Sequence, residues 1–191
     1  MIRSLSLALF VLTAPLAAAD WTIDGEHSNA LFKIQHMNAG YTWGRFDDIS
    51  GSIRYDEANQ AGSKVTVSIK AASISTKVQK MEEHLRSATF FDVVQHPTLG
   101  FVSTAWKKTA DGVFDVTGNL TIHGVTKAVT IKVTRTGLGE NAFTKKAVVG
   151  FESTFAIKRS DYGMTNMLGP VGDDVTLTIA LEAMQNDPLT K

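Results

Sequence analysis

The chain has 191 residues, of which 43% are hydrophobic, and its 19 basic residues balance its 19 acidic ones. Without a basic stripe or polybasic block, this charge argues against nucleic-acid binding. The sequence contains no cysteine, which excludes a disulfide framework, a thiolate nucleophile and a zinc–thiolate site. The length is typical of a single domain whose core needs no covalent cross-links.

The first nineteen residues have the features of a Sec signal peptide. Arg3 supplies the positive start, residues 5–12 are almost entirely apolar, and Ala17 to Ala19 fit an A-x-A cleavage site. An uncleaved anchor is the alternative, but the apolar run is short for a membrane-spanning helix. We therefore expect residues 1–19 to be removed near Ala19, residues 20–191 to form one domain, and the protein to be periplasmic or secreted.

Most of the remaining sequence alternates apolar and polar residues with a period of two, which is typical of half-buried strands. In residues 64–71, for example, Val65, Val67 and Ile69 share one face, and lysine, threonine and serine residues occupy the other. The pattern predicts strands over residues 21–25, 30–37, 41–55, 64–71, 99–106, 113–122, 125–133, 148–157 and 175–181.

The predicted strand 41–55 contains a shift of parity. Phe46 falls on one face and Ile49 and Ile53 on the other, and Ser50–Gly51 lie beside the shift. This predicts a β-bulge of the kind that lets a sheet curl. Such a strand would reach roughly 45–50 Å at about 3.3 Å per residue, which favours a closed barrel over a sandwich.

One segment departs from the strand pattern. In residues 77–91, Val78, Met81 and Leu85 recur at roughly helical spacing, which predicts one helix or two short helical turns before Pro97. Loops are expected over residues 56–63 and over Gly137–Asn141.

The clearest single element is a β-hairpin. The apolar residues of Val113–Ile122 fall on even positions and those of Val125–Val133 on odd ones. His123–Gly124 between them predicts a tight reversal that depends on glycine.

No catalytic or metal-ligating motif is found. The five histidines form neither H-x-x-x-H nor H-E-x-x-H, no carboxylate stands at a metal-ligand spacing from them, and no G-x-S-x-G elbow occurs. We therefore expect no metal, no cofactor and no enzymatic activity. The alternative is an enzyme acting on a hydrophobic substrate with His36 or His27 as base.

Arg159 and Asp161 share parity and are expected to pair, which would order the loop that carries Met164 and Met167. Methionine-rich loops adapt to irregular apolar shapes. This loop is interpreted either as a plug at the end of a barrel or as a lid over a lipid chain.

Several motifs then occur in a specific order. They are D-G-E-H-S at 24–28, F-K-I-Q-H at 32–36, H-L-R-S at 84–87 with F-F-D at 90–92, H-P-T-L-G-F at 96–101, G-N-L-T-I-H-G-V-T-K at 118–127 and R-S-D-Y-G-M at 159–164. This pattern resembles the YceI-like family of polyisoprenoid-binding proteins over residues 21–184.

The resemblance implies an all-β fold, an extended eight-stranded antiparallel lipocalin-like barrel with one short helical insertion. It also implies a long apolar tunnel that holds an isoprenoid chain, such as a polyprenyl phosphate or a quinone tail, for transport or storage in the periplasm. From alternation we expect the tunnel to be lined by Phe32, Ile34, His36, Phe46, Phe101, Phe114, Phe151 and Phe155, with Met164 and Met167 near a mouth.

Such a protein would load from the inner membrane through transient contact. Related barrels can pair, so a homodimer is left open. A structural β-domain with a filled core is the remaining alternative.

Overall fold

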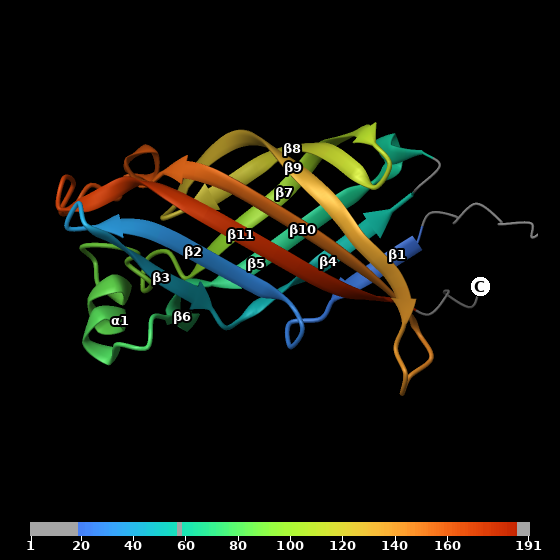
Figure 1. Ribbon diagram of the computed structural model, residues 1–191, viewed down its shortest axis with the longest axis horizontal. Helices are drawn as coiled ribbons and strands as arrows, with labels where there is room; N and C mark the ends of the chain where they lie inside the picture. Colours follow the sequence, from blue (N-terminus) through green and yellow to red (C-terminus); the bar gives the residue numbers. More distant parts are fainter. Residues whose placement is uncertain (1–18, 57–58, 187–191) are drawn as a thin grey trace, which may run out of the picture.

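A computed structural model describes residues 19–56 and 59–186 (Figure 1). All of the predicted signal peptide except Ala19 lies outside the described residues. Among the described residues, no helix is both long and apolar enough to span a bilayer.

The described residues form strands, one α-helix and short 3₁₀ helices. The strands are β1 (Ala19–Ile23), β2 (Asn29–His36), β3 (Gly40–Phe46), β4 (Ile49–Tyr55), β5 (Lys64–Lys70), β6 (Ile74–Ser75), β7 (Thr98–Ala110), β8 (Val113–Ile122), β9 (Val125–Glu140), β10 (Ala147–Lys158) and β11 (Val171–Gln185). The helices are η1 (Gln60–Gly62), η2 (Ala71–Ser73), α1 (Gln79–Arg86) and η3 (Arg159–Tyr162).

The predicted eight-stranded antiparallel barrel is confirmed. Its strands follow the order β1-β4-β5-β7-β8-β9-β10-β11, and β11 pairs back to β1 to close the ring. The first part of β11, Val171–Ala180, pairs instead with β2, from which β3 and β6 continue the sheet. The long strand β11 therefore closes the ring by pairing with β1 at one end, and at its other end it pairs with a flap of three strands, β2, β3 and β6.

The prediction of one strand over residues 41–55 is wrong. The chain bends at Asp47–Asp48, and β3 and β4 on either side of the bend pair with different neighbours. The bend is tied to η2, because the backbone N–H of Asp47 donates to the carbonyl oxygen of Ser73 (3.1 Å) and that of Asp48 to the Ser73 hydroxyl (3.1 Å). The parity shift therefore marks the point where the chain passes from β3 to β4, and not a bulge within one strand.

The long strands expected of a barrel lie elsewhere. β9 has 16 residues and β11 has 15. Residues 137–140, predicted to lie in a loop, belong to β9 because Gly137 to Glu140 pair with β10, and the connecting loop follows at residues 141–146. The helix is shorter than the predicted segment 77–91, since Ser87 adopts an extended backbone conformation directly after α1.

The predicted hairpin of β8 and β9 is confirmed. Ile122 pairs with Val125 across the turn, and His123 and Gly124 have φ angles of 50° and 74°. Two successive residues with positive φ form the turn type that matches the twist of a two-stranded ribbon, and glycine adopts this conformation without steric cost.

The barrel is packed solid at the end farther from α1. Tyr55, Trp106, Phe114 and Phe151 form a cluster there, with ring centroids 5.4 to 6.5 Å apart. Arg135 donates to the Tyr55 hydroxyl from the rim of this cluster (3.1 Å). Rings at these distances pack favourably, so the cluster closes this end of the barrel.

Candidate functional site

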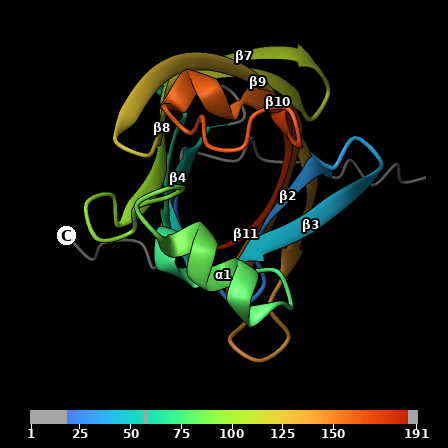
Figure 2. The ribbon, with the colours of Figure 1, turned by 90° about the vertical axis from the view of Figure 1, so that its left-hand side faces the viewer.

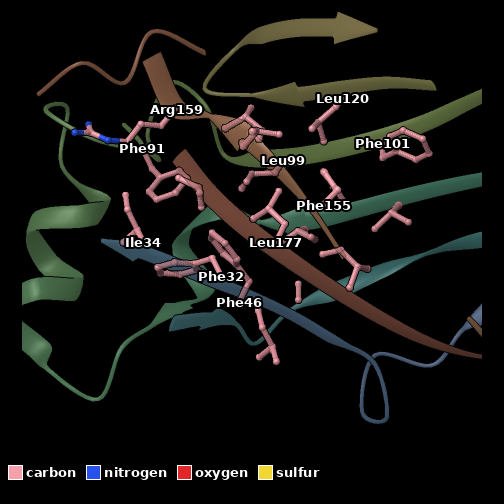
Figure 3. A pocket seen from close by; sticks show the side chains of 18 of the residues that line it. Phe32, Ile34, Phe46, Phe91, Leu99, Phe101, Leu120, Phe155, Arg159 and Leu177 are labelled. Carbon is pink, nitrogen blue, oxygen red and sulfur yellow. The ribbon is translucent and has the colours of Figure 1, made fainter. Parts of the chain in front are cut away.

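The other part of the barrel encloses a cavity of about 460 Å³ (Figure 3). Its wall is almost entirely apolar and is built mainly by inward-facing residues of β2 to β5 and β7 to β11. Figure 3 shows side chains such as Leu99, Leu120 and Leu177 surrounding this space from different strands. Cavities of a few hundred Å³ with apolar walls are typical of sites for small hydrophobic molecules.

Two glycines keep the bulky wall residues away from the barrel axis. Phe32 of β2 pairs with Gly44 of β3, where an added Cβ atom would stand only 2.3 Å from the Phe32 ring. The ring of Phe101 of β7 lies against Gly118 of β8, which is diagonal to it in the pairing of the two strands. Because glycine has no side chain, each ring can lie against the neighbouring strand, and space is left along the axis.

The cavity opens at the end that carries α1 and η3. Four of its five exposed wall residues, His36, Lys80, His84 and Met167, belong to this end, and the fifth is Glu152 of β10. Figure 2 shows this end, with α1 lying across one side of the ring and η3 on the opposite side. Together with the aromatic cluster at the far end, this arrangement makes a blind pocket with one mouth.

A second aromatic group narrows the mouth. The ring centroids of Phe32 and Phe46 are 5.9 Å apart, and Phe91 packs edge-on against Phe46 at 5.6 Å. Phe91 comes from the loop that follows α1, so the helix and its loop form part of the wall. Movement of this loop would change the width of the opening.

Arg159 fixes the loop on the opposite side of the mouth. Its guanidinium is buried and donates to the backbone carbonyl oxygens of Met164 (2.8 Å), Asn166 (2.7 Å), Val171 (3.1 Å) and Gly172 (2.8 Å). Burial lowers the pKa of Arg159, and nearby Asp173 partly opposes this shift. In Figure 3 the nitrogen-bearing end of Arg159 points away from the apolar side chains.

The predicted pairing of Arg159 with Asp161 is wrong. Asp161 pairs instead with Lys127 of β9 at 3.2 Å, because Arg159 turns inward to the carbonyl groups while Asp161 faces outward on η3. The start of η3 is held by Asp173, whose carboxylate accepts hydrogen bonds from the Ser160 N–H (2.9 Å) and hydroxyl (2.8 Å). The N–H of Ser160 is the main reason why the pKa of Asp173 is lowered.

Comparisons with known proteins place this architecture in a family. A model of the YceI-like domain matches residues 21–183. The chain belongs to the YceI-like family. Protein YceI of Salmonella newport (strain SL254) is 38% identical over 180 residues, which cover 93% of each chain.

Solved structures show the same fold. The crystal structure of BcnA from Burkholderia cenocepacia matches with a TM-score of 0.73 and 26% identity, covering 84% of this chain and 98% of that one. A polyisoprenoid-binding domain from Saccharophagus degradans matches with a TM-score of 0.69 over 87% of this chain and 98% of its own, but is only 16% identical. The second likeness concerns the fold alone.

In this YceI-like domain, nine of the ten residues predicted to bind a ligand lie on the cavity wall. They are Phe32, Ile34, His36, Phe46, Phe101, Phe151, Phe155, Met164 and Met167. Phe114 faces inward as predicted but lies outside the cavity, because it packs in the aromatic cluster beside Tyr55 and Trp106. Contact between these nine residues and a ligand stays a prediction.

Some wall residues were not among the predicted binding residues. Met81, His84 and Leu85 reach the cavity from α1, and Phe90 and Phe91 from the loop behind it. The helical spacing of Met81 and Leu85 signals a shared apolar face, but spacing alone does not say what that face covers. Val65, Val67 and Ile69 follow directly from the alternation of β5.

His27 lies outside the cavity. Its Nδ1 is 2.8 Å from Asp24 Oδ2, and this contact is the main cause of both a raised pKa of His27 and a lowered pKa of Asp24. Asp24, His27 and Glu182 have potential ligand atoms within 4.8 Å of one another, a grouping that sequence spacing did not reveal. The hydrogen bond between His27 and Asp24 accounts for their proximity without an ion.

Proposed function

We propose that this YceI-like protein binds the chain of an isoprenoid lipid in its cavity, and that it carries or stores this lipid in the periplasm. The observation that carries the proposal is a blind apolar cavity with a single mouth on the axis of the barrel. The signal peptide predicted from residues 1–19 supports export. The motifs that resemble those of polyisoprenoid-binding proteins support the class of ligand, and a polyisoprenoid-binding domain from Saccharophagus degradans has the same fold.

The size of the cavity defines the part of the lipid that is enclosed. A dry cavity of about 150 Å³ holds one benzene molecule, and the present cavity of about 460 Å³ is roughly three times as large. It therefore suits about 18–20 carbons, or about four isoprene units. The head group, or the rest of a longer chain, would lie at the mouth beside His36, Lys80 and His84.

The energetics favour exchange between a membrane and the protein. Moving about twenty carbons out of water at about 0.8 kcal/mol each gives nominally about 16 kcal/mol, near the upper limit of non-covalent affinity. Between a bilayer and an apolar cavity these hydrophobic contributions nearly cancel. We therefore propose that the shape of the cavity and the polar groups at its mouth determine which lipid is held.

The geometry gives less support to the alternatives. His36 faces the cavity, but its side chain makes no hydrogen bond within the described chain, whereas His27 has an acidic partner and lies outside the cavity. Neither histidine therefore combines an orienting acid with access to an enclosed substrate. A structural β-domain with a filled core does not account for the open space along the axis.

The proposal is tested by obstructing the cavity. Leu99→Trp and Leu177→Trp each place a bulky ring inside it, whereas Val102→Trp adds the same ring on the exposed face of β7. With delipidated protein and a fluorescent quinone analogue, we expect both cavity variants to lose affinity by about tenfold or more and Val102→Trp to bind like wild type. Equal binding by all four folded proteins would contradict the proposal.

A further inference from the structure

Exposed apolar side chains gather around the mouth of the cavity. Among the described residues, seven of the ten large hydrophobic side chains with the highest exposure lie at this end. We call them the apolar rim: Met37, Tyr41, Trp43, Val78, Val94, Met167 and Leu168. Clusters of this kind are uncommon on soluble proteins and usually mark an interaction surface.

The apolar rim is assembled from segments that are distant in the sequence. Met37 lies in the turn between β2 and β3, Val78 directly precedes α1, Val94 follows α1, and Leu168 lies in the loop after η3. Figures 1 and 2 show these segments gathered at the end of the barrel that carries α1. The rim therefore surrounds the mouth, and Met167 belongs both to it and to the cavity wall.

The chemistry of the rim fits the boundary between water and lipid. Tyr41 and Trp43 stand side by side on the outer face of β3, and Lys33 places its Nζ 4.9 Å and 5.5 Å from the centres of their rings. Tryptophan and tyrosine combine an apolar body with a polar atom and concentrate at membrane interfaces, where lysine keeps its ammonium group in water.

The acidic groups near the mouth are largely engaged. Asp161 pairs with Lys127, Asp174 with Lys158, and Asp173 accepts the hydrogen bonds of Ser160. These three carboxylates therefore present little uncompensated negative charge that would repel a membrane surface. Apolar insertion must therefore supply most of the binding free energy.

We propose that the apolar rim inserts into the surface of a lipid bilayer and places the mouth of the cavity against the acyl chains. This inference rests on the proposed lipid-binding function and names the surface through which the lipid enters and leaves. It predicts that binding to vesicles depends on Met37, Trp43 and Leu168 and changes little with salt concentration, because burial of apolar area is not screened.

The protein carries its own probe for this experiment. Of its three tryptophans, Trp43 is 59% exposed, whereas Trp21 and Trp106 are 1% and 8% exposed. A change of tryptophan emission on adding vesicles therefore reports chiefly on Trp43. With vesicles of phosphatidylethanolamine and phosphatidylglycerol, we expect emission to shift to shorter wavelength, and brominated lipid chains to quench it.

Matched variants locate the contact. Met37→Asp combined with Leu168→Asp places two charges in the rim and should weaken vesicle binding about tenfold or more. Phe143→Asp is the control, because Phe143 is 95% exposed in the loop between β9 and β10, away from the mouth. This variant should bind vesicles like wild type, and thermal unfolding should show that both variants remain folded.

The outcomes separate this inference from the proposed function. If wild-type protein contains lipid but its tryptophan emission does not shift with vesicles, the proposed insertion of the apolar rim is wrong and the proposed lipid binding still stands. A shift with vesicles in a protein that never takes up lipid would support the rim and count against the proposed function. A third outcome is that wild-type protein does not bind vesicles but sediments as a dimer, and that the double aspartate variant sediments as a monomer. The apolar rim would then contact a second copy of the chain, and the proposal would be overturned.

Discussion

Phe101 of β7 lies diagonally across from Gly118 of β8, and a Cβ atom at Gly118 would stand 2.4 Å from the Phe101 ring and 2.6 Å from the carbonyl oxygen of Val102. The ring therefore occupies the space that a side chain at position 118 would need. This relationship, repeated at Phe32 and Gly44, explains how a barrel rich in phenylalanine keeps an open axis.

Replacing Gly118 by alanine should disturb both packing and binding. The backbone oxygen of Val102 cannot move far, so we expect Gly118→Ala to lower the free energy of unfolding by about 1–3 kcal/mol. It should also push the Phe101 ring into the cavity and weaken ligand uptake. Urea unfolding and titration with the quinone analogue measure the two effects.

Gly137→Ala is the matched control, because apart from its two neighbours in the chain no residue has an atom within 4 Å of the position where its Cβ would stand in β9. This variant should unfold and bind like wild type. If Gly118→Ala behaved the same way, the close approach of Phe101 would not limit the size of the cavity.

The loop after η3 should depend on Arg159. Arg159→Met removes hydrogen bonds to four buried or partly buried carbonyl groups, and we expect a loss of about 2–4 kcal/mol in the free energy of unfolding. Amide hydrogen exchange should become faster over residues 163–170. Lys158→Met removes an exposed pair with Asp174 and should change the free energy of unfolding little, so equal losses in both variants would refute this role of Arg159.

The contact between His27 and Asp24 should make stability depend on pH. The pKa of His27 is raised by the hydrogen bond with Asp24, so its contribution is complete below the ordinary pKa near 6.5 and is lost as the pH rises through the folded-state value. The pKa of Asp24 is lowered by the same contact, so its contribution is lost as the pH falls through its folded-state value.

The difference in melting temperature between wild type and His27→Asn should therefore be larger near pH 5.5 than near pH 8.5. These pH values lie on either side of the ordinary histidine pKa of about 6.5. The difference should be small, since the His27 side chain is 62% exposed. Asp24→Asn should remove the same dependence, and a constant difference across this range would contradict the assignment.

The size of the cavity predicts how affinity varies with chain length. For isoprenoid alcohols that compete with the quinone analogue, affinity should rise by more than about tenfold for each added unit, up to about four units, and then level off. The plateau is expected because a cavity of about 460 Å³ is then full. A steady rise to about eight units would show that the protein encloses a longer tunnel.

The sequence predicted the faces of the strands well, because alternation follows directly from strand geometry. Phe32 and Ile34 lie on the cavity wall for this reason. Phe114 shows the limit of the method: its parity is correct, but parity carries no information about position along the barrel axis. Whether an inward residue meets the cavity or the closed end depends on which strands pair and in what register.

Other features depend on contacts between distant segments. The bend at Asp47–Asp48 is held by η2, and the inward turn of Arg159 is satisfied by carbonyl groups of the loop and of β11. Local pattern assigns Arg159 to its nearest acid, whereas in the fold its guanidinium donates to four backbone carbonyl oxygens. The place of α1 beside the mouth is likewise set by tertiary packing.

The central claim, that the barrel holds an isoprenoid chain, is tested most directly by its contents. The protein is purified without detergent and extracted with organic solvent, and the extract is analysed by mass spectrometry beside that of Leu177→Trp. We expect an isoprenoid lipid in near-equimolar amount in wild type and little in the variant. An empty wild-type protein that also fails to take up a quinone would contradict the account.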